Sequence, residues 1–215
     1  MPCVPRPVPT PLCHFTHVDH ISLIIKHGLL SDSKAQSTGL LLTEVGHRGI
    51  KGRRRSREVP VPPGGAVGDY APFYFAPRSP MMYVIHRGGV PTYDGGCDDL
   101  VYLVTTVERL AELGLPMVFT DRNAALKVAA FAEGLSRLDE LVDWRLMAEE
   151  RWSNTPEEPD RKERRMAECL VHDCVPWEAF TTVVVKSPEC AQRATSAISS
   201  LGQSTPVVVR PDWYF

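Results

Sequence analysis

The sequence lacks the features of membrane-spanning, secreted and strongly charged proteins. No apolar run approaches 18 residues, and the N-terminal stretch MPCVPRPVPTPLC is too rich in proline to be a signal peptide. The six cysteines form no CxxC pair, so we expect reduced thiols. The net charge of −2 creates no global field toward nucleic acid or membrane, and any basic surface must be local. These absences predict a cytoplasmic protein with no membrane association.

Several catalytic and metal-binding motifs are also missing. There is no GxxxxGK[ST] loop to cradle a nucleoside triphosphate and no GxSxG elbow for acyl transfer. The segment CHFTHVDH at 13–20 places cysteine and histidine close together, but its spacing does not fit a zinc site. We therefore expect no metal. A histidine that ends a strand at a cleft is better suited to hydrogen-bond a ligand.

What is present predicts one α+β domain. The 215 residues, 43% of them hydrophobic, suffice for a single core over 1–215, preceded by a loosely ordered, proline-rich arm at 1–11. Neither repeats nor linkers divide the chain, and short strands alternate with short helices, as in a mixed sheet. The expected strands are 12–17, 71–76, 100–104, 117–120, 166–171, 181–186 and 206–210. The expected helices are 19–28, 80–85, 105–114, one that starts after Asp121, 138–152 and 187–201. Their expected caps are Asp19 for the first helix, Ser79 for the second, a capping box at Thr105 for the third and Asp121 for the fourth. Residues 46–57 and 153–165 are expected to be polar loops.

Glu168 is the carboxylate that calls for an explanation. It lies within the apolar stretch 166–171, and strand alternation places it on one face with Met166 and Leu170. A charged group among apolar side chains is costly unless it is paired or kept there for chemistry. The sequence therefore allows two interpretations, a structural ion pair with a nearby arginine or a catalytic carboxylate.

A cationic cluster precedes the middle of the chain. Arg53, Arg54, Arg55 and Arg57 are either a solvated basic loop or a site that contacts anions through guanidinium forks.

The aromatic segment FYFAPRSPMMY at 73–83 has two faces. Phe73 and Phe75 are expected to pack in the core, and Tyr74 faces the other way, where it can stack on a flat ring. Farther along the chain, Asn123 either belongs to a helix cap or hydrogen-bonds a ligand.

Taken together, these segments resemble the DarT-type ADP-ribosyltransferase toxins, which use NAD+ to modify a base in single-stranded DNA. The resemblance covers nearly the whole chain, and several motifs in one order are more specific than any one of them. It rests on HFTHVDHISLIIKHGLL at 14–30, IKGRRR at 50–55, VPPGGAVGDYAPFYFAPRSPMMY at 61–83, TDRNAA at 120–125, RRMAECLVHDCVP at 164–176 and RPDWYF at 210–215. It implies an ADP-ribosyltransferase-like mixed β-sheet split around an NAD+ cleft, with peripheral helices.

The resemblance also implies roles for individual residues. The catalytic glutamate falls on Glu168, and the catalytic arginine falls on Arg54, with Arg53 and Arg55 as alternates. The residues implied for NAD+ are His14, Phe15, Thr16, Leu23, Gly28, Arg54 and Tyr74. Those implied for DNA are Arg53, Arg55, Tyr74, Arg78, Met81 and Asn123. His20 departs from the family, which usually has asparagine there.

The chemistry suits these residue types. Loss of nicotinamide leaves positive charge on the ribose, which a fixed carboxylate stabilises, and a base must leave the duplex stack to react. The resemblance implies an enzyme with NAD+ as co-substrate that modifies a base, expected to be thymine, in single-stranded DNA, paired as a toxin with a DarG-like macrodomain antitoxin that reverses the modification. The alternatives are a transferase acting on protein or RNA, an NAD glycohydrolase, and a non-catalytic nucleic-acid-binding module.

Overall fold

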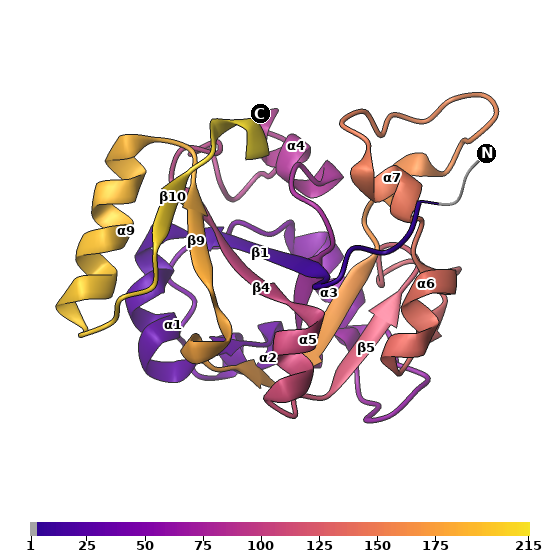
Figure 1. The fold of residues 1–215 in the computed structure, drawn as a ribbon, viewed down its shortest axis with the longest axis horizontal. Helices are drawn as coiled ribbons and strands as arrows, with labels where there is room; N and C mark the ends of the chain where they lie inside the picture. Colours follow the sequence, from indigo (N-terminus) through magenta and orange to yellow (C-terminus); the bar gives the residue numbers. More distant parts are fainter. Residues whose placement is uncertain (1–3) are drawn as a thin grey trace.

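A mixed eight-stranded sheet organises the chain. The computed structural model describes residues 4–215, and the strand order of its main sheet is β10-β9-β4-β1-β3-β7-β5-β6. Figure 1 labels β10, β9, β4, β1 and β5 of this sheet. Neighbouring strands are antiparallel except for β10 and β9, which are parallel. The strands are β1 (Pro11–His17), β3 (Tyr70–Tyr74), β4 (Leu100–Thr106), β5 (Met117–Thr120), β6 (Phe131–Ala132), β7 (Glu168–His172), β9 (Thr182–Val185) and β10 (Val207–Val209). A separate small sheet pairs β2 (Leu29–Leu30) with β8 (Cys174–Val175).

The sheet consists of two halves that share one joint. Strand β1 pairs with β4 along all seven of its residues, and β3 pairs with β7 along all five of its own. Between β1 and β3, however, the only paired positions are Cys13 and Tyr74 among the described residues. Since β3 ends at Tyr74, the two halves separate beyond this pair, between 14–17 of β1 and 70–73 of β3, which confirms the predicted split of a mixed sheet.

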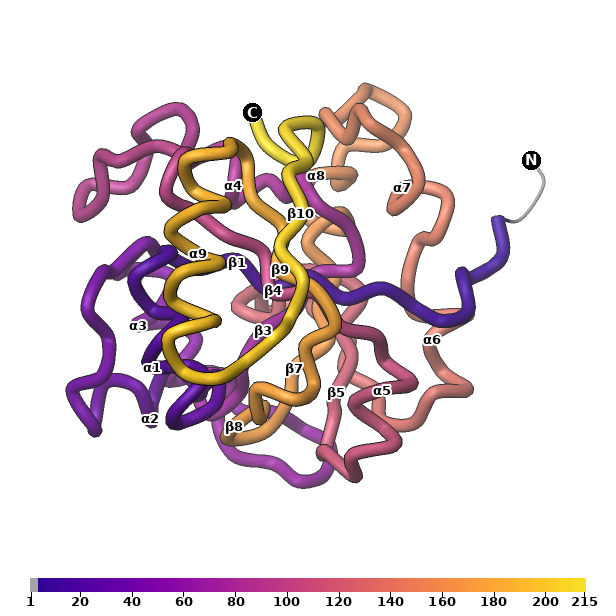
Figure 2. Tube along the Cα trace, turned by 60° about the vertical axis from the view of Figure 1, so that its left-hand side comes forward, coloured from indigo at the N-terminus to yellow at the C-terminus, as the bar shows by residue number. Residues whose placement is uncertain are grey.

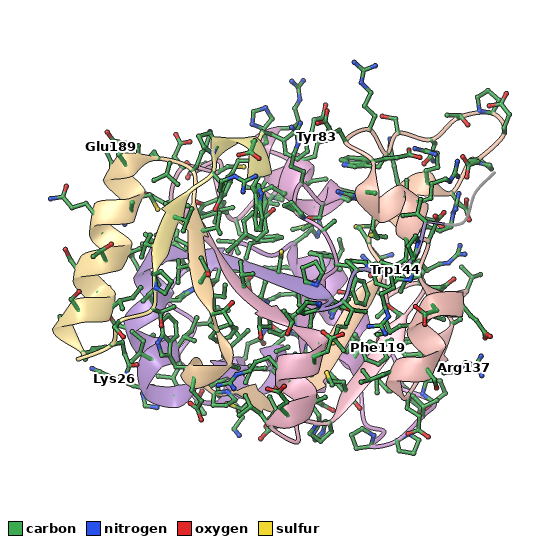
Figure 3. The ribbon with its side chains drawn as sticks, viewed as in Figure 1. Lys26, Tyr83, Phe119, Arg137, Trp144 and Glu189 are labelled. Atoms are coloured by element: carbon green, nitrogen blue, oxygen red, sulfur yellow. The ribbon has the colours of Figure 1, made fainter. Side chains whose placement is uncertain are left out.

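Helices surround the sheet. Figure 2 shows α1, α2 and α3 grouped at one side, with α5, α6 and α7 at the other. The labelled side chains of Phe119 and Trp144 are buried, whereas Lys26 and Glu189 are exposed at the periphery (Figure 3). The helices are α1 (Ile21–His27), α2 (Asp32–Ser37), α3 (Arg48–Ser56), α4 (Pro80–His86), α5 (Val107–Glu112), α6 (Leu138–Leu141), α7 (Trp144–Ala148), α8 (Arg161–Arg164) and α9 (Pro188–Ser200). Within residues 4–215, no helix has the length and apolar character needed to span a bilayer.

The basic segment at 46–57 is a helix, and the prediction of a loop was wrong. Helix α3 begins after His47, whose side chain accepts a hydrogen bond from the backbone N–H of Gly49. Arg54 is its only buried residue, while Ile50 is half-buried one turn earlier. Because the inward stripe is mostly a guanidinium, a search for apolar periodicity cannot detect this helix.

The helix predicted after Asp121 does not form. Residues 121–130 make a loop, which Asp121 closes by accepting a hydrogen bond from the N–H of Ala130 at 2.8 Å. The side chain of an aspartate offers the backbone this alternative to a helix. The loop brings the N–H of Ala124 to Glu168, as described below.

Other boundaries shift for local reasons. Asp19 lies in a 3-10 turn (Val18–His20) capped by the ring of His17, so the predicted N-cap was wrong. Thr106 rather than Thr105 caps α5. The predicted helix at 138–152 is broken between α6 and α7, where Asp143 caps α7, and the predicted loop at 153–165 contains α8. Strand β7 begins only at Glu168, because Met166 belongs to the preceding turn.

The N-terminal arm is fixed where it can be described. Residues 1–3 lie outside the described residues. The guanidinium of Arg6 pairs with Glu108 at 3.0 Å, and Thr10 is fully buried with its N–H on the same carboxylate. The expectation of a loosely ordered arm is therefore wrong for residues 6–11, and Pro11 is already part of β1.

Candidate active site

Glu168 occupies the first position of β7, beside the joint of the sheet. It is paired with Tyr74 of the neighbouring strand β3 and is only 1% exposed. Nη1 of Arg54 donates to its two carboxylate oxygens at 2.8 and 3.0 Å, and the N–H of Ala124 donates to Oε2 at 2.9 Å. The backbone N–H of Glu168 is held by the hydroxyl of Thr120 at 3.1 Å. The carboxylate is thus fixed by one charged and one neutral donor.

Arg54 is the one residue of the cationic cluster that reaches this carboxylate. It is 9% exposed, whereas Arg53 is exposed and Arg55 turns outward to pair with Asp32 at 3.1 Å. Its second terminal nitrogen, Nη2, is buried and has no hydrogen-bond partner within residues 4–215. An unpaired guanidinium N–H in a buried position is costly, so it is a ready donor for a ligand.

A cavity of about 330 Å³ opens at the split between β1 and β3. This volume lies within the usual range for small-molecule sites. Of the residues expected to hold NAD+, all seven line it: His14, Phe15, Thr16, Leu23, Gly28, Arg54 and Tyr74. Glu168, Met81 and Asn123 line it as well, whereas Arg53, Arg55 and Arg78 do not.

His14 is held in one tautomer on the cavity wall. Its Nδ1 lies 2.7 Å from the carbonyl oxygen of Pro72, and a carbonyl can only accept, so Nδ1 carries the proton. Burial lowers the ring pKa to about 4, and the hydrogen bond to Pro72 opposes this only in part. The neutral ring therefore keeps Nε2 as a hydrogen-bond acceptor.

Two aromatic rings stand beside Glu168. Phe15 and Tyr74 are stacked, with centroids 6.3 Å apart and planes 15° from parallel. Burial, and next the charge of Glu168, raise the pKa of the Tyr74 hydroxyl. Tyr74 therefore stays neutral and offers an aromatic face, as the alternation of β3 predicts.

Some of the residues expected to contact DNA line the cavity, and others lie outside it. Asn123 lies beside Glu168 in the cavity, where its Oδ1 accepts from the N–H of Ala125 at 2.9 Å. Arg78 lies outside the cavity, with its guanidinium 4.5 Å from the ring centre of Phe215. Its backbone has φ +54, an uncommon conformation for arginine, and its N–H and carbonyl bond to Tyr102 and Trp152.

The outer wall of the cavity was missed from the sequence. The segment 38–47 has no regular structure, and its lining residues are Leu40, Leu41, Thr43, Glu44, Val45, Gly46 and His47. Glu44 is bonded to Lys51 of α3 at 2.6 Å, and Lys51 also pairs with Asp32. A loop without periodicity or motif gives no local signal, because it is placed by contacts with other elements such as α3.

A mixed sheet split around a cavity with a buried carboxylate–guanidinium pair defines the class of protein as an ADP-ribosyltransferase fold. The profile of the family described as "ssDNA thymidine ADP-ribosyltransferase, DarT" matches residues 13–215. The chain belongs to this DarT family of enzymes.

Relatives and solved structures agree with this placement. A DNA ADP-ribosyl transferase of Thermus sp. (strain 2.9) is 35% identical over 216 residues, covering 97% of this chain and 98% of the relative. Thermus sp. 2.9 DarT in complex with ADP-ribosylated ssDNA is similar with a TM-score of 0.91, 33% identity and coverage of 100% of both chains. The same protein in complex with NAD+ gives a TM-score of 0.83, 34% identity and coverage of 97% and 99%.

One relative is named as a fusion of the transferase with a glycohydrolase. A DNA ADP-ribosyl transferase-DNA ADP-ribosyl glycohydrolase fusion protein of Thermosipho africanus is 26% identical over 206 residues, covering 95% of this chain and 49% of the fusion. The present chain therefore corresponds to about half of that fusion's length.

Proposed function

We propose that this enzyme transfers ADP-ribose from NAD+ to a thymine base in single-stranded DNA, with Glu168 and Arg54 as its catalytic residues. The observation that carries the proposal is the buried Arg54–Glu168 pair inside the cavity at the split of the sheet. The Thermus relatives that bind NAD+ and ADP-ribosylated ssDNA support the two substrates.

Glu168 acts on the ribose and on the acceptor base. As the bond between ribose C1′ and nicotinamide breaks, its electron pair leaves with nicotinamide and positive charge develops on the sugar. The fixed carboxylate of Glu168 stabilises that charge more than it stabilises the ground state. The same carboxylate takes the proton from a thymine ring nitrogen, which then forms the new bond to C1′.

Arg54 supplies the anion contact. Its Nη2 is free for a phosphate oxygen of NAD+ while Nη1 holds Glu168. This links cofactor binding to the carboxylate, since one guanidinium contacts both. Arg53 and Arg55, which stand on the outer faces of α3, are better placed to contact the DNA backbone than to perform catalysis.

The remaining roles follow from position. The nicotinamide half of NAD+ is bound by His14, Phe15 and Thr16 on β1, while Leu23 and Gly28 close the floor. Tyr74 contacts both substrates, because it borders the carboxylate and presents its ring to the cavity. The target base enters beside Met81 and Asn123, and Arg78 binds the strand outside the cavity.

The biological setting is part of the proposal. A single ADP-ribosyltransferase domain spanning 1–215 would act in the cytoplasm, where NAD+ and DNA meet. The fused glycohydrolase of Thermosipho africanus supports a partner of the DarG type, a macrodomain antitoxin that removes the modification. This enzyme would then be the toxin of a toxin–antitoxin pair.

The test is mass spectrometry of a thymine-containing single strand after incubation with enzyme and NAD+. We expect an adduct with the mass of ADP-ribose on the single strand, but none on the same sequence as a duplex or on a strand without thymine. Glu168→Gln should abolish the adduct. Glu178→Gln, which alters an exposed glutamate outside the cavity lining, should not. Labelling of protein or RNA in place of DNA would refute the assigned acceptor.

A further inference from the structure

His20 uses both of its ring nitrogens. It lies in the 3-10 turn between β1 and α1 and is 5% exposed. Its Nδ1 is 2.7 Å from the hydroxyl oxygen of Thr16, and its Nε2 is 3.0 Å from the backbone nitrogen of Thr43. The ring therefore connects strand β1 to the segment that forms the outer wall of the cavity.

These two contacts determine the tautomer. A backbone N–H can only donate, so Nε2 must accept from Thr43 and carries no proton. A neutral ring then has its proton on Nδ1, which donates to Thr16. Burial lowers the pKa of His20 to about 4, so the neutral ring predominates near neutral pH.

The tautomer in turn orients the hydroxyl of Thr16. Because its oxygen accepts from His20, its own proton remains for another acceptor. Within residues 4–215 that hydroxyl makes no hydrogen bond besides the one to His20. Thr16 lines the cavity, so its free donor is available to a ligand there.

The hydrogen bond from Thr43 to His20 holds the outer wall of the cavity, segment 38–47, in place. Segment 38–47 lacks regular structure and includes Leu42, which is 63% exposed. The N–H of Thr43 is bonded to His20 near the middle of this segment, and the neighbouring Glu44 is bonded to Lys51. The bond from Thr43 is thus the polar contact that joins this segment to the turn after β1, beside the apolar packing of Val45.

We propose that His20 is a positioning residue that aims the Thr16 hydroxyl at a hydrogen-bond acceptor of NAD+ and holds the Thr43 segment as the outer wall of the NAD+ site. The inference rests on the proposed function for the identity of the ligand. His20 lines the cavity itself, but both of its ring nitrogens are bonded within the chain. It acts through two neighbours, and each connection can be tested separately.

Two amide substitutions separate the two contacts. The amide of asparagine overlays Nδ1 of histidine and can still donate to Thr16, whereas the longer glutamine places its amide near Nε2 and can still accept from Thr43. His20→Asn should therefore keep the contact with Thr16 and lose that with Thr43. His20→Gln should do the opposite, and His20→Ala should lose both.

The contact with Thr43 is measured by amide hydrogen exchange in the protein without ligand. We expect the Thr43 amide to be protected in the wild type and His20→Gln, and to exchange several-fold faster in His20→Asn and His20→Ala. Equal exchange in all four proteins would overturn the role of His20 in the wall. Since this readout needs no NAD+, it is independent of the proposed function.

The contact with Thr16 is measured by combining each variant with Thr16→Val. The valine substitution should raise the KM for NAD+ about tenfold in the wild type and in His20→Asn, but less than about twofold in His20→Gln and His20→Ala. The same penalty in every background would show that His20 does not act through Thr16. Failure of the wild type to bind NAD+ would instead refute the proposed function.

Spectroscopy and a matched control complete the design. Ring ¹⁵N chemical shifts of His20 should report the Nδ1–H tautomer, and an Nε2–H tautomer would overturn the proposal. His86→Asn is the control, because His86 is exposed on α4 and does not line the cavity. It should change neither the exchange of Thr43 nor the KM for NAD+.

Discussion

Tyr74 on β3 is directly paired with Glu168 on β7. Tyr74 is also paired with Cys13, and this is the only pair between β3 and β1 within residues 4–215. The carboxylate is therefore next to the one joint between the halves of the sheet. A strand position supported on both sides by hydrogen-bonded neighbours is rigid, and rigidity is what an electrostatic catalyst requires. Beyond the joint the strands β1 and β3 separate, and residues of both strands line the cavity there.

Replacing Arg54 should impair catalysis far more than replacing its neighbours. Arg54→Lys keeps the charge but not the geometry, since an ammonium cannot hold Glu168 and a phosphate in the same way. We expect kcat/KM for NAD+ to fall at least about 100-fold. Arg55→Lys, at a half-exposed position, should change it less than about threefold. Initial rates of DNA modification decide between them, and similar losses in both variants would contradict the assignment.

The Arg54–Glu168 pair should also matter for stability, in a characteristic way. Removing one partner leaves a charge buried and unpaired, so Glu168→Ala and Arg54→Met should each cost about 3 kcal/mol of unfolding free energy. The double variant should cost less than the sum, because it leaves no lone charge. Urea unfolding of the four proteins measures this, and simple additivity would show that the pair is not coupled.

Two histidines predict how stability depends on pH. The pKa of His14 and that of His20 are lowered from 6.5 to about 4 by burial. At a pH between these two pKa values, the histidines are protonated in the unfolded chain but neutral in the folded chain. The free energy of unfolding therefore falls as the pH drops from about 6.5 to about 4. Each histidine contributes at most about 1.4 kcal/mol per pH unit.

Urea unfolding across that pH window is the measurement. His20→Asn removes one of the two groups and should make the dependence shallower. Ion-paired carboxylates act at lower pH, because the pKa of Glu158 is lowered to about 2 by hydrogen bonds from Arg164 and Arg145. A flat profile between about 6.5 and about 4 would contradict the burial of the histidines as neutral rings.

Gly28 should be intolerant of any side chain. Its φ is +78, and an added Cβ would lie 2.3 Å from Sγ of Cys174 and 2.9 Å from the carbonyl oxygen of Val175. Gly39 is the matched control, since it has φ +68 but, among residues 4–215, no neighbouring atom within 4 Å of an added Cβ. Gly39→Ala should cost about 1 kcal/mol from backbone strain alone, and Gly28→Ala clearly more. Thermal unfolding measures the loss of stability in both variants. Equal losses would show that Cys174 moves aside without cost when Gly28 gains a Cβ.

The exposed arginines of α3 should govern the salt dependence of DNA binding. If Arg53 contacts a phosphate, Arg53→Ala should reduce the slope of log affinity against log salt concentration by about 0.7 for a single strand. Arg137, whose side chain is 61% exposed at the periphery in Figure 3, is the control and should leave the slope unchanged when replaced by alanine. Fluorescence anisotropy of a labelled oligonucleotide measures both slopes. An unchanged slope for Arg53→Ala would remove it from the DNA surface.

The sequence by itself predicted seven of the eight strands of the main sheet within residues 4–215, the caps of α4 and α9, and a carboxylate at Glu168 among apolar side chains, whereas β6 and the short strands β2 and β8 were missed. Strands such as β4 and β9 are apolar runs that pack in any orientation, so local pattern suffices to predict them. Ser79 and Ser187 each cap a helix that starts with proline, as their sequence signals predict. The DarT resemblance was also carried by motifs in one order along the chain, and the family placement confirms it.

The resemblance placed the catalytic arginine on Arg54 with Arg53 and Arg55 as alternates, but only the tertiary structure shows that Arg54 is the one that reaches Glu168. The selection comes from helix α3, which turns one guanidinium inward, toward a carboxylate 114 residues farther along the chain. The loop that closes on Asp121, the wall at 38–47 and the two bonds of His20 are likewise fixed by hydrogen bonds of polar side chains. Such groups have no periodicity of their own, and their positions are fixed only when the rest of the chain has folded around them.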